Sequence, residues 1–437
     1  MGGQGRPVTR LAPDSRRSLL AFSAVTTLFF AWGFITSNND PLVVTLRAAF
    51  SLNYTEALLT QIVSFLANGL LSLPAAWLCS RIGSIDTILA SLALMVLGCL
   101  AVVLSTDANS FAPILAALFV LAAGFTGLQV AANPLAAELG PPHRRHFRLN
   151  FAQAFNSLGV VLGVHFGSLV MLGGFPGEPG KAASAQPSRA AILGSVDRAY
   201  VIMAALLLSL LLLFAMLRKP LSSAAPDQLR PAPAGMFEAL RSRWAVFGAV
   251  AIGLYVGAEV SIGSIMINFL NQPQVLGLPF EVAGGYLANF YWGGALCGRI
   301  VGTLLLTRMR ADRLLATCGV VAVALCLTVL VGHGPVAGYA ALAIGLFNSI
   351  MFPTIFTITL ERSGVSQSAT SGLLCVAIFG GALLPLAVGA LADRFGLSAA
   401  FAVPLLGYAF IALFAVAARE GRAGSVVLLP AQGSPIP

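Results

Sequence analysis

The chain has 437 residues, of which 58% are hydrophobic and only 9% are charged. Soluble domains carry roughly 25% charged residues, so this composition excludes an ordinary soluble protein and indicates one embedded in a membrane. The net charge of +9 comes from basic residues in short loops between apolar runs, which favours membrane topology over a nucleic-acid partner.

A membrane helix needs about 20 mostly apolar residues, and about twelve runs of this kind follow one another along the chain. They lie near 18–46, 55–79, 85–106, 110–137, 147–174, 198–217, 243–271, 281–307, 312–332, 335–361, 367–392 and 397–418.

The longest polar break, 218–242, is rich in proline, alanine and charge and divides the runs six and six. The sequence therefore predicts an all-α integral membrane protein of two pseudo-symmetric six-helix lobes. The expected parts are a tail (1–17), the N-terminal lobe (18–217), a linker (218–242), the C-terminal lobe (243–418) and a second tail (419–437).

The basic residues indicate the orientation of these runs in the membrane. With the N-terminus in the cytoplasm, nineteen of the 25 Lys and Arg residues fall in cytoplasmic segments and five fall outside, while Arg299 lies within a run. The cluster "HRRHFR" (143–148) is one of the cytoplasmic segments. The positive-inside rule then predicts a multi-pass protein of the plasma (inner) membrane, with both termini in the cytoplasm.

The two halves of the sequence resemble each other. Three pairs of residues are separated by the same 219 positions: Asp40 and Glu259, Gln129 and Asn348, and Pro134 and Pro353. In addition, "FLAN" (65–68) recurs as "YLAN" (286–289), 221 positions later. These matches indicate a duplicated six-helix unit, and transporters built from such halves bind substrate near the membrane midplane.

Several motifs connect the chain with a known family. "WGFITSNNDP" (32–41), "AANP" (131–134) and "NFAQAFNSLG" (150–159) resemble the major facilitator superfamily sugar permeases, in the fucose and glucose/galactose branch. The resemblance implies ion-coupled import of a monosaccharide by alternating access. The chain departs from the fucose permeases at Gln129, where they carry an acidic residue, and from the superfamily signature at the reduced "CSRIGSID" (79–86).

Two acidic residues interrupt apolar runs. A charged carboxylate in hydrocarbon costs about 2.5–3.5 kcal/mol on insertion scales, so Asp40 and Glu259 are candidates for proton coupling. Pro41 follows Asp40 and removes a helical donor, so we expect an irregular helix that lines a cavity. The alternatives are a carboxylate at the outer membrane rim for Asp40 and a structural hydrogen bond for Glu259.

Amide side chains within the apolar runs are candidates for binding sugar hydroxyls, because an amide both donates and accepts hydrogen bonds. An aromatic ring such as that of Trp292 covers the apolar face of a sugar. Amides also join helices to one another, and that alternative stays open. The expected substrate-binding residues are Asn39, Gln129, Asn133, Gln153, Asn156, Asn289, Trp292 and Asn348.

These observations predict a transporter, not an enzyme, that imports a glucose- or galactose-like hexose by proton symport. The alternatives are sodium coupling, an amino sugar such as N-acetylglucosamine, a membrane-embedded enzyme and a membrane sugar sensor. We expect no cofactor or metal, membrane lipids and a monosaccharide as partners, no nucleic acid, and function as a monomer.

Overall fold

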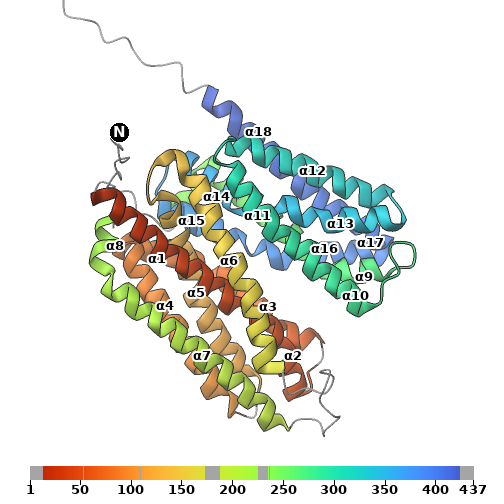
Figure 1. The fold of residues 1–437 in the computed structure, drawn as a ribbon, viewed down its shortest axis with the longest axis horizontal. Coiled ribbons are helices and arrows are strands. Elements are labelled where there is room, and N and C mark those ends of the chain that lie inside the picture. Colours follow the sequence, from red (N-terminus) through yellow and green to blue (C-terminus); the bar gives the residue numbers. More distant parts are fainter. Residues whose placement is uncertain are drawn as a thin grey trace, which may run out of the picture. The chain divides into compact units, whose positions relative to one another are not determined.

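The computed structural model describes residues 13–423 except 53, 109, 173–187, 225–234 and 236, and these described residues form helices without a β-strand (Figure 1). Eleven helical segments of this described part are long and apolar enough to cross a membrane. The further span expected near 281–307 is also helical, from Phe280 to Leu305. The predicted all-α membrane architecture is confirmed. The outer parts of both predicted tails and most of the linker's middle lie outside the described residues.

The chain divides into two compact units, which are described separately. Unit 1 contains the described residues up to Glu238 together with Val365–Cys375, and unit 2 contains Ala239–Gly364 and the described residues from Val376 onward. The segment Val365–Cys375 thus groups with unit 1 although it follows most of unit 2 in the sequence.

The helices of the first half all belong to unit 1. They are α1 (Pro13–Thr36), α2 (Asn39–Phe50), α3 (Tyr54–Ile82), α4 (Ser84–Thr106), α5 (Ala112–Glu138), α6 (Arg145–Gly167), α7 (Arg189–Met216) and α8 (Arg218–Ala224). A 3₁₀ turn, η1 (Pro142–Arg144), precedes α6, and a π-helical turn, η2 (Ser168–Leu172), follows it.

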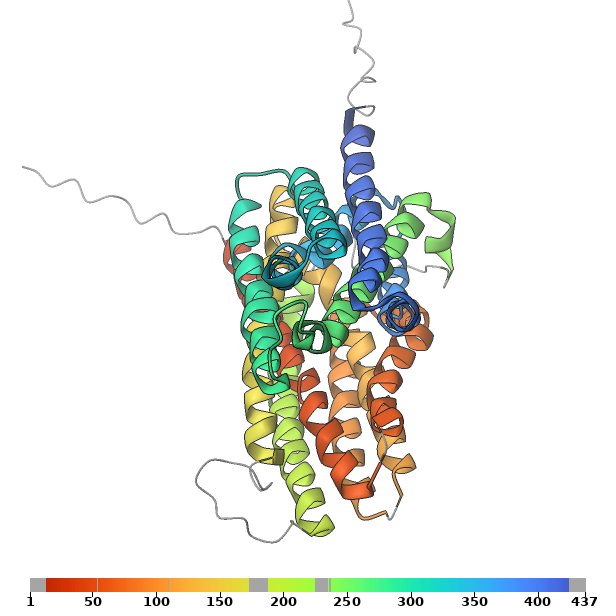
Figure 2. The ribbon, with the colours of Figure 1, turned by 90° about the vertical axis from the view of Figure 1, so that its right-hand side faces the viewer.

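The second half begins with a 3₁₀ turn, η4 (Glu238–Arg241), and a π-helical turn, η5, later interrupts one span. The helices and this turn are α9 (Arg243–Asn271), α10 (Phe280–Tyr286), η5 (Leu287–Trp292), α11 (Gly293–Leu305), α12 (Ala311–Val331), α13 (Gly334–Asn348), α14 (Met351–Arg362), α15 (Gln367–Ala377), α16 (Gly380–Phe395), α17 (Leu397–Ala400) and α18 (Ala402–Ala423). In unit 2, α12 packs against α18 and α13, and α9 packs against α16 and α18 (Figure 2).

Glycines bring α1 and α6 into close contact within unit 1 (Figure 1). A Cβ at Gly163 would collide with the Phe34 carbonyl oxygen and the Ser37 hydroxyl, and one at Gly159 would collide with the Phe30 carbonyl oxygen. In the other direction, a Cβ at Gly33 would collide with the Asn156 carbonyl oxygen. The GxxxG spacing therefore serves helix packing, as small residues do in membranes where apolar burial provides no driving force.

Five of the predicted runs are interrupted helices, of which the twelfth divides into α17 and α18 at Phe401. The first run divides into α1 and α2 before Pro41, the tenth into α13 and α14 before Pro353, and the eleventh into α15 and α16 at 378–379. Pro41 and Pro353 are each the third residue of the following helix, where a missing backbone N–H removes no helical bond. Pro134, the repeat counterpart of Pro353, instead lies inside the continuous α5. The π-helical turn η5 interrupts the eighth run.

The sixth predicted run begins too late. Helix α7 starts at Arg189, nine positions before the expected 198, because the Ser188 hydroxyl accepts a hydrogen bond from the Ala191 N–H at 3.3 Å. This N-cap satisfies one of the free donors of the first turn. Polar residues between 188 and 198 interrupt the apolar pattern, so the pattern did not predict the first turns of α7.

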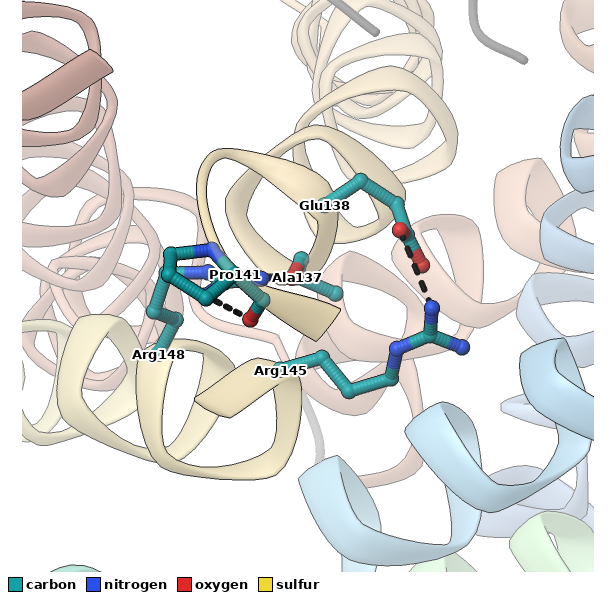
Figure 3. A network of polar contacts seen from close by, with 5 residues as sticks. All are labelled: Ala137, Glu138, Pro141, Arg145 and Arg148. Atoms are coloured by element: carbon teal, nitrogen blue, oxygen red, sulfur yellow. Dashed lines mark hydrogen bonds and ion pairs between the residues drawn. The ribbon is translucent and has the colours of Figure 1, made fainter. Parts of the chain in front are cut away.

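Arg148 of α6 caps the C-terminal end of α5 (Figure 3). Its guanidinium is buried and donates to the Ala137 carbonyl oxygen at 3.1 Å and to the Pro141 carbonyl oxygen at 2.8 Å. Beside it, Arg145 forms an ion pair with Glu138 at 3.3 Å. Carbonyls at a helix end have no partner within the helix, so two arginines of the expected positive cluster hold the chain reversal between α5 and α6.

Asp86 of the "CSRIGSID" segment forms a bidentate ion pair that ties α4 to α8. Arg218 donates through Nε and Nη2 to the two carboxylate oxygens, at 2.7 and 2.8 Å. The hydrogen bonds and the negative charge of Asp86 raise the pKa of Arg218 above its usual value. Because Arg218 is exposed, this pair positions α8 beside α4 but contributes little to stability.

We expect Gly163→Ala to lower the free energy of unfolding by about 1–3 kcal/mol, because the added methyl group forces α1 and α6 apart. The thermal unfolding midpoint of the protein in detergent measures this loss. Gly194→Ala in α7 is the matched control, since nothing lies within 4 Å of a Cβ at that position. An equal midpoint for both variants would contradict the packing role of Gly163.

We expect Arg148→Ala to lower the free energy of unfolding by about 1–3 kcal/mol, because buried carbonyl groups at the end of α5 lose their donor. Arg144→Ala removes an exposed arginine of the same segment and serves as the control, with an expected change within about 0.5 kcal/mol. If the two variants unfold at the same denaturant concentration or temperature, Arg148 does not stabilise the reversal.

Candidate functional site

The break between α1 and α2 is held by Asn38. Its buried side chain donates through Nδ2 to the Phe34 carbonyl oxygen at 2.6 Å, and its own backbone carbonyl accepts from the Leu42 N–H at 3.1 Å. Among the described residues, none bonds the Asn38 Oδ1 atom. The irregular helix predicted from Pro41 is confirmed, whereas Asn38, which bridges the break, was not among the predicted site residues.

Asp40 and Asn39 are the first two residues of α2. The Asn39 side chain is half-buried. The Asp40 side chain lies outside the described part of the structure, so its role in proton coupling stays a prediction.

The amides of unit 1 are joined in pairs between helices. Gln129 of α5 donates through Nε2 to the Asn68 Oδ1 atom of α3 at 3.3 Å. Gln153 of α6 donates through Nε2 to the Asn133 Oδ1 atom at 3.4 Å. All four side chains are buried, so each pair satisfies polar groups that would be costly without partners.

Two further features belong to this polar group of unit 1. Asn156 is half-buried and donates through Nδ2 to the Phe29 carbonyl oxygen of α1 at 3.0 Å. No described residue accepts a bond from the buried Asn133 Nδ2 atom, so one donor remains for a ligand. Asn68 was not predicted as a site residue, although its recurrence in "FLAN" and "YLAN" was the available signal.

In unit 2, two tyrosines fix Glu259. The Tyr255 hydroxyl, one helical turn earlier in α9, donates to the Glu259 Oε1 atom at 2.8 Å. The Tyr291 hydroxyl of η5 donates to the Glu259 backbone carbonyl at 3.3 Å. Both tyrosines are fully buried, whereas Glu259 is half-buried. Tyr291 was not among the predicted site residues.

Asn348 connects this cluster with α18. It is fully buried and donates through Nδ2 to the hydroxyl oxygens of Tyr291 at 3.1 Å and Tyr408 at 3.5 Å. Asn348 is the last residue of α13, immediately before the break that precedes α14. The side chain thus projects from a helix end, the same setting in which Asn38 lies in unit 1.

Arg299 of α11 satisfies the backbone at this break. Its Nε atom donates to the Ser349 carbonyl oxygen at 3.0 Å. Its guanidinium also interacts electrostatically with Glu259. A cation at a helix C-terminus is favourable, since the partial charge of that end is negative.

The π-helical turn explains why the two repeats differ. In unit 1, Gln129 bonds Asn68, but the counterpart of Gln129 in unit 2, Asn348, bonds Tyr291. Tyr291 lies two positions beyond Asn289, the sequence counterpart of Asn68. The wider turn of η5 rotates the segment, so that Tyr291 is buried while Asn289 and Trp292 are exposed.

The structure therefore groups most of the predicted residues into one polar cluster in each unit. Gln129, Asn133, Gln153 and Asn156 belong to unit 1, and Glu259 and Asn348 belong to unit 2. Within the described ranges, no three His, Cys, Asp or Glu side chains are grouped to hold a metal ion.

Comparison with known proteins agrees with the family resemblance of the sequence motifs. The family model of the Major Facilitator Superfamily matches residues 18–377. A glucose/galactose transporter of Brucella abortus is 40% identical over 394 residues, which cover 90% of this chain and 93% of that protein. An L-fucose-proton symporter of Escherichia coli is 30% identical over 428 residues, which cover 94% of this chain and 95% of that protein.

The fold agrees with this result. The crystal structure of the transporter FucP in the outward conformation has a TM-score of 0.82 and 27% sequence identity, and the match covers 92% of this chain and 99% of that chain. The length of the family match and the identity over nearly the whole chain lead to one conclusion: the chain belongs to the Major Facilitator Superfamily.

Proposed function

We propose that this protein is a secondary active transporter that imports a glucose- or galactose-like hexose together with a proton. The observation that carries the proposal is the set of polar side chains within the helices of each unit of a membrane protein: the paired amides of unit 1, and Glu259 with Asn348 in unit 2. Hydrocarbon disfavours such groups, so their presence points to a polar ligand. The relatives named as glucose/galactose transporter and L-fucose-proton symporter support a sugar as this ligand and a proton as the coupling ion.

The mechanism assigns the coupling step to the acids and the recognition step to the amides. Protonated Asp40, assisted by Glu259, permits sugar binding, and rocking of the two lobes then releases both ligands into the cytoplasm. The sugar-binding set is proposed to comprise Asn39, Gln129, Asn133, Gln153, Asn156, Asn289, Trp292 and Asn348. Coupling requires that sugar and proton bind the outward and inward states with different affinities.

The proposal includes the setting of the protein. The distribution of arginines favours the inner membrane with both termini cytoplasmic, and the transporter acts as a monomer without a cofactor. Sodium coupling and an amino sugar such as N-acetylglucosamine are the alternatives. Radiolabelled sugar uptake into proteoliposomes, with pH and sodium gradients imposed separately, distinguishes them. Absence of gradient-driven uptake for every sugar would contradict the proposal.

We expect Asp40→Asn to abolish accumulation of sugar against a gradient and to retain binding and exchange. Accumulation requires release of the proton inside, whereas exchange of sugar for sugar does not. Uptake and counterflow in proteoliposomes measure the two processes. Asp197→Asn removes another acid from a membrane helix, one that bonds Thr106, and is expected to accumulate sugar normally. Normal accumulation by Asp40→Asn would remove Asp40 from the mechanism.

We expect Gln129→Ala and Asn348→Ala each to weaken sugar binding by about 0.5–1.5 kcal/mol, the net contribution of one hydrogen bond. Equilibrium binding to purified, correctly folded protein measures the change. Gln274→Ala alters an exposed amide in the loop after α9 and is the control. Unchanged affinity in both variants would show that these amides only join helices.

A further inference from the structure

One carboxylate oxygen of Glu259 receives no hydrogen bond from the described residues. Its Oε1 atom accepts the hydrogen bond from Tyr255, but no residue in the described part of the chain donates to its Oε2 atom. The side chain is half-buried, and Oε2 is not among the fully buried atoms that lack a partner. One oxygen of the carboxylate is therefore fixed by the protein while the other is open.

The surroundings hold this carboxylate in a single direction. Tyr255 lies one turn before Glu259 on the same helix, so its hydroxyl fixes the side chain locally. Tyr291 fixes the backbone of Glu259 from a second helical segment. The guanidinium of Arg299 provides a positive charge from a third segment, α11. Such an arrangement is preorganised, because a ligand meets the carboxylate without having to order it first.

The direction of the hydrogen bonds also orients Asn348. The Tyr291 hydroxyl has one hydrogen and uses it on the Glu259 backbone carbonyl, so it must accept from the Asn348 amide nitrogen. The Asn348 Oδ1 atom consequently faces away from Tyr291, and no described group donates to it. The cluster thus contains two unmatched acceptors, the open Oε2 of Glu259 and the deeper Oδ1 of Asn348.

We propose that the Oε2 atom of Glu259 accepts a hydrogen bond from one hydroxyl group of the transported sugar. This inference rests on the proposed function and separates the roles of the two acids. Glu259 recognises the sugar, and Asp40 carries the coupling proton. Tyr255 is a positioning residue that acts on the sugar only through the Glu259 carboxylate.

The polarity of this bond makes the proposal testable. An ionised carboxylate accepts hydrogen bonds and donates none, so the sugar hydroxyl must be the donor. A deoxy analogue lacks this hydroxyl, and a deoxyfluoro analogue carries a group that accepts weakly and cannot donate. In Glu259→Gln, the Tyr255 hydroxyl holds Oε1 of the new amide, so an N–H donor replaces the acceptor at the open position.

The experiment measures competition against a radiolabelled sugar bound to the purified full-length protein. The label is whichever of D-glucose, D-galactose and N-acetylglucosamine the wild type binds, and the competitors are its deoxy and deoxyfluoro analogues at each ring position. At one position, both analogues should bind the wild type about tenfold or more weakly than the parent sugar, the scale of a bond to a charged group. In Glu259→Gln, the fluoro analogue at that position should bind more tightly than the deoxy analogue.

Three variants complete the design. Tyr255→Phe should weaken binding of the parent sugar but retain the same loss with both analogues, since the carboxylate is still present. Tyr339→Phe changes an exposed tyrosine of α13 and should behave as the wild type. Asp197→Asn is the matched control for loss of a membrane acid and should also behave as the wild type.

The possible results separate this inference from the function on which it rests. If the wild type binds none of the sugars, the proposed function fails, and the inference fails with it. If the wild type binds a sugar but no ring position shows the shared loss, Glu259 does not contact it. A pattern of losses that is unchanged in Glu259→Gln also overturns the inference and leaves the transport function standing.

Discussion

The structure depends on one constraint: in hydrocarbon, backbone polar groups must find partners within the protein. Continuous helices satisfy it by themselves, whereas an interruption needs short-range backbone bonds, as between α15 and α16, or a side chain that supplies the missing bonds. Asn38 does so between α1 and α2, Arg299 at the end of α13, and Arg148 at the end of α5. Some polar and charged residues are therefore required by the helix ends, whereas Asn133 and Glu259 lie within continuous helices that need no such partner.

The two repeats use the same scaffold for different chemistry. In both, an amide at an equivalent position bonds a group on a neighbouring helix, but the partner is Asn68 in unit 1 and Tyr291 in unit 2. The π-helical turn η5 accounts for the exchange, because a wider turn changes which side chain faces inward. Among the described residues, unit 1 retains an unmatched donor on Asn133 and an unmatched acceptor on Asn38, and unit 2 retains acceptors on Glu259 and Asn348.

Close packing limits where these groups can lie. The α1–α6 contact leaves no room for a Cβ at Gly159 or Gly163, which holds Asn156 against the Phe29 carbonyl. Polar atoms in such packed helices fall into two groups, those bonded within the protein and those that a ligand can bond. Tyr255 bonds the Oε1 atom of Glu259 and Tyr291 bonds its backbone carbonyl, whereas no described residue donates to the Oε2 atom. Specificity then follows from the direction of hydrogen bonds more than from their number.

The sequence by itself determined the architecture, because the apolar runs reveal their length, their number and their repeat without knowledge of neighbours. Pro41 also revealed the first helix break, since a proline acts on its own backbone. The sequence did not reveal why Pro134 leaves α5 continuous while Pro353 follows a break. Nor did it reveal the partners of Gln129, Glu259 and Asn348. Those outcomes depend on side chains from other helical segments, Asn68, Tyr291 and Tyr408 among them, and on a π-helical turn that shifts the register. Only the tertiary structure brings such groups within hydrogen-bonding distance, because each bond joins residues whose spacing along the chain carries no signal of contact.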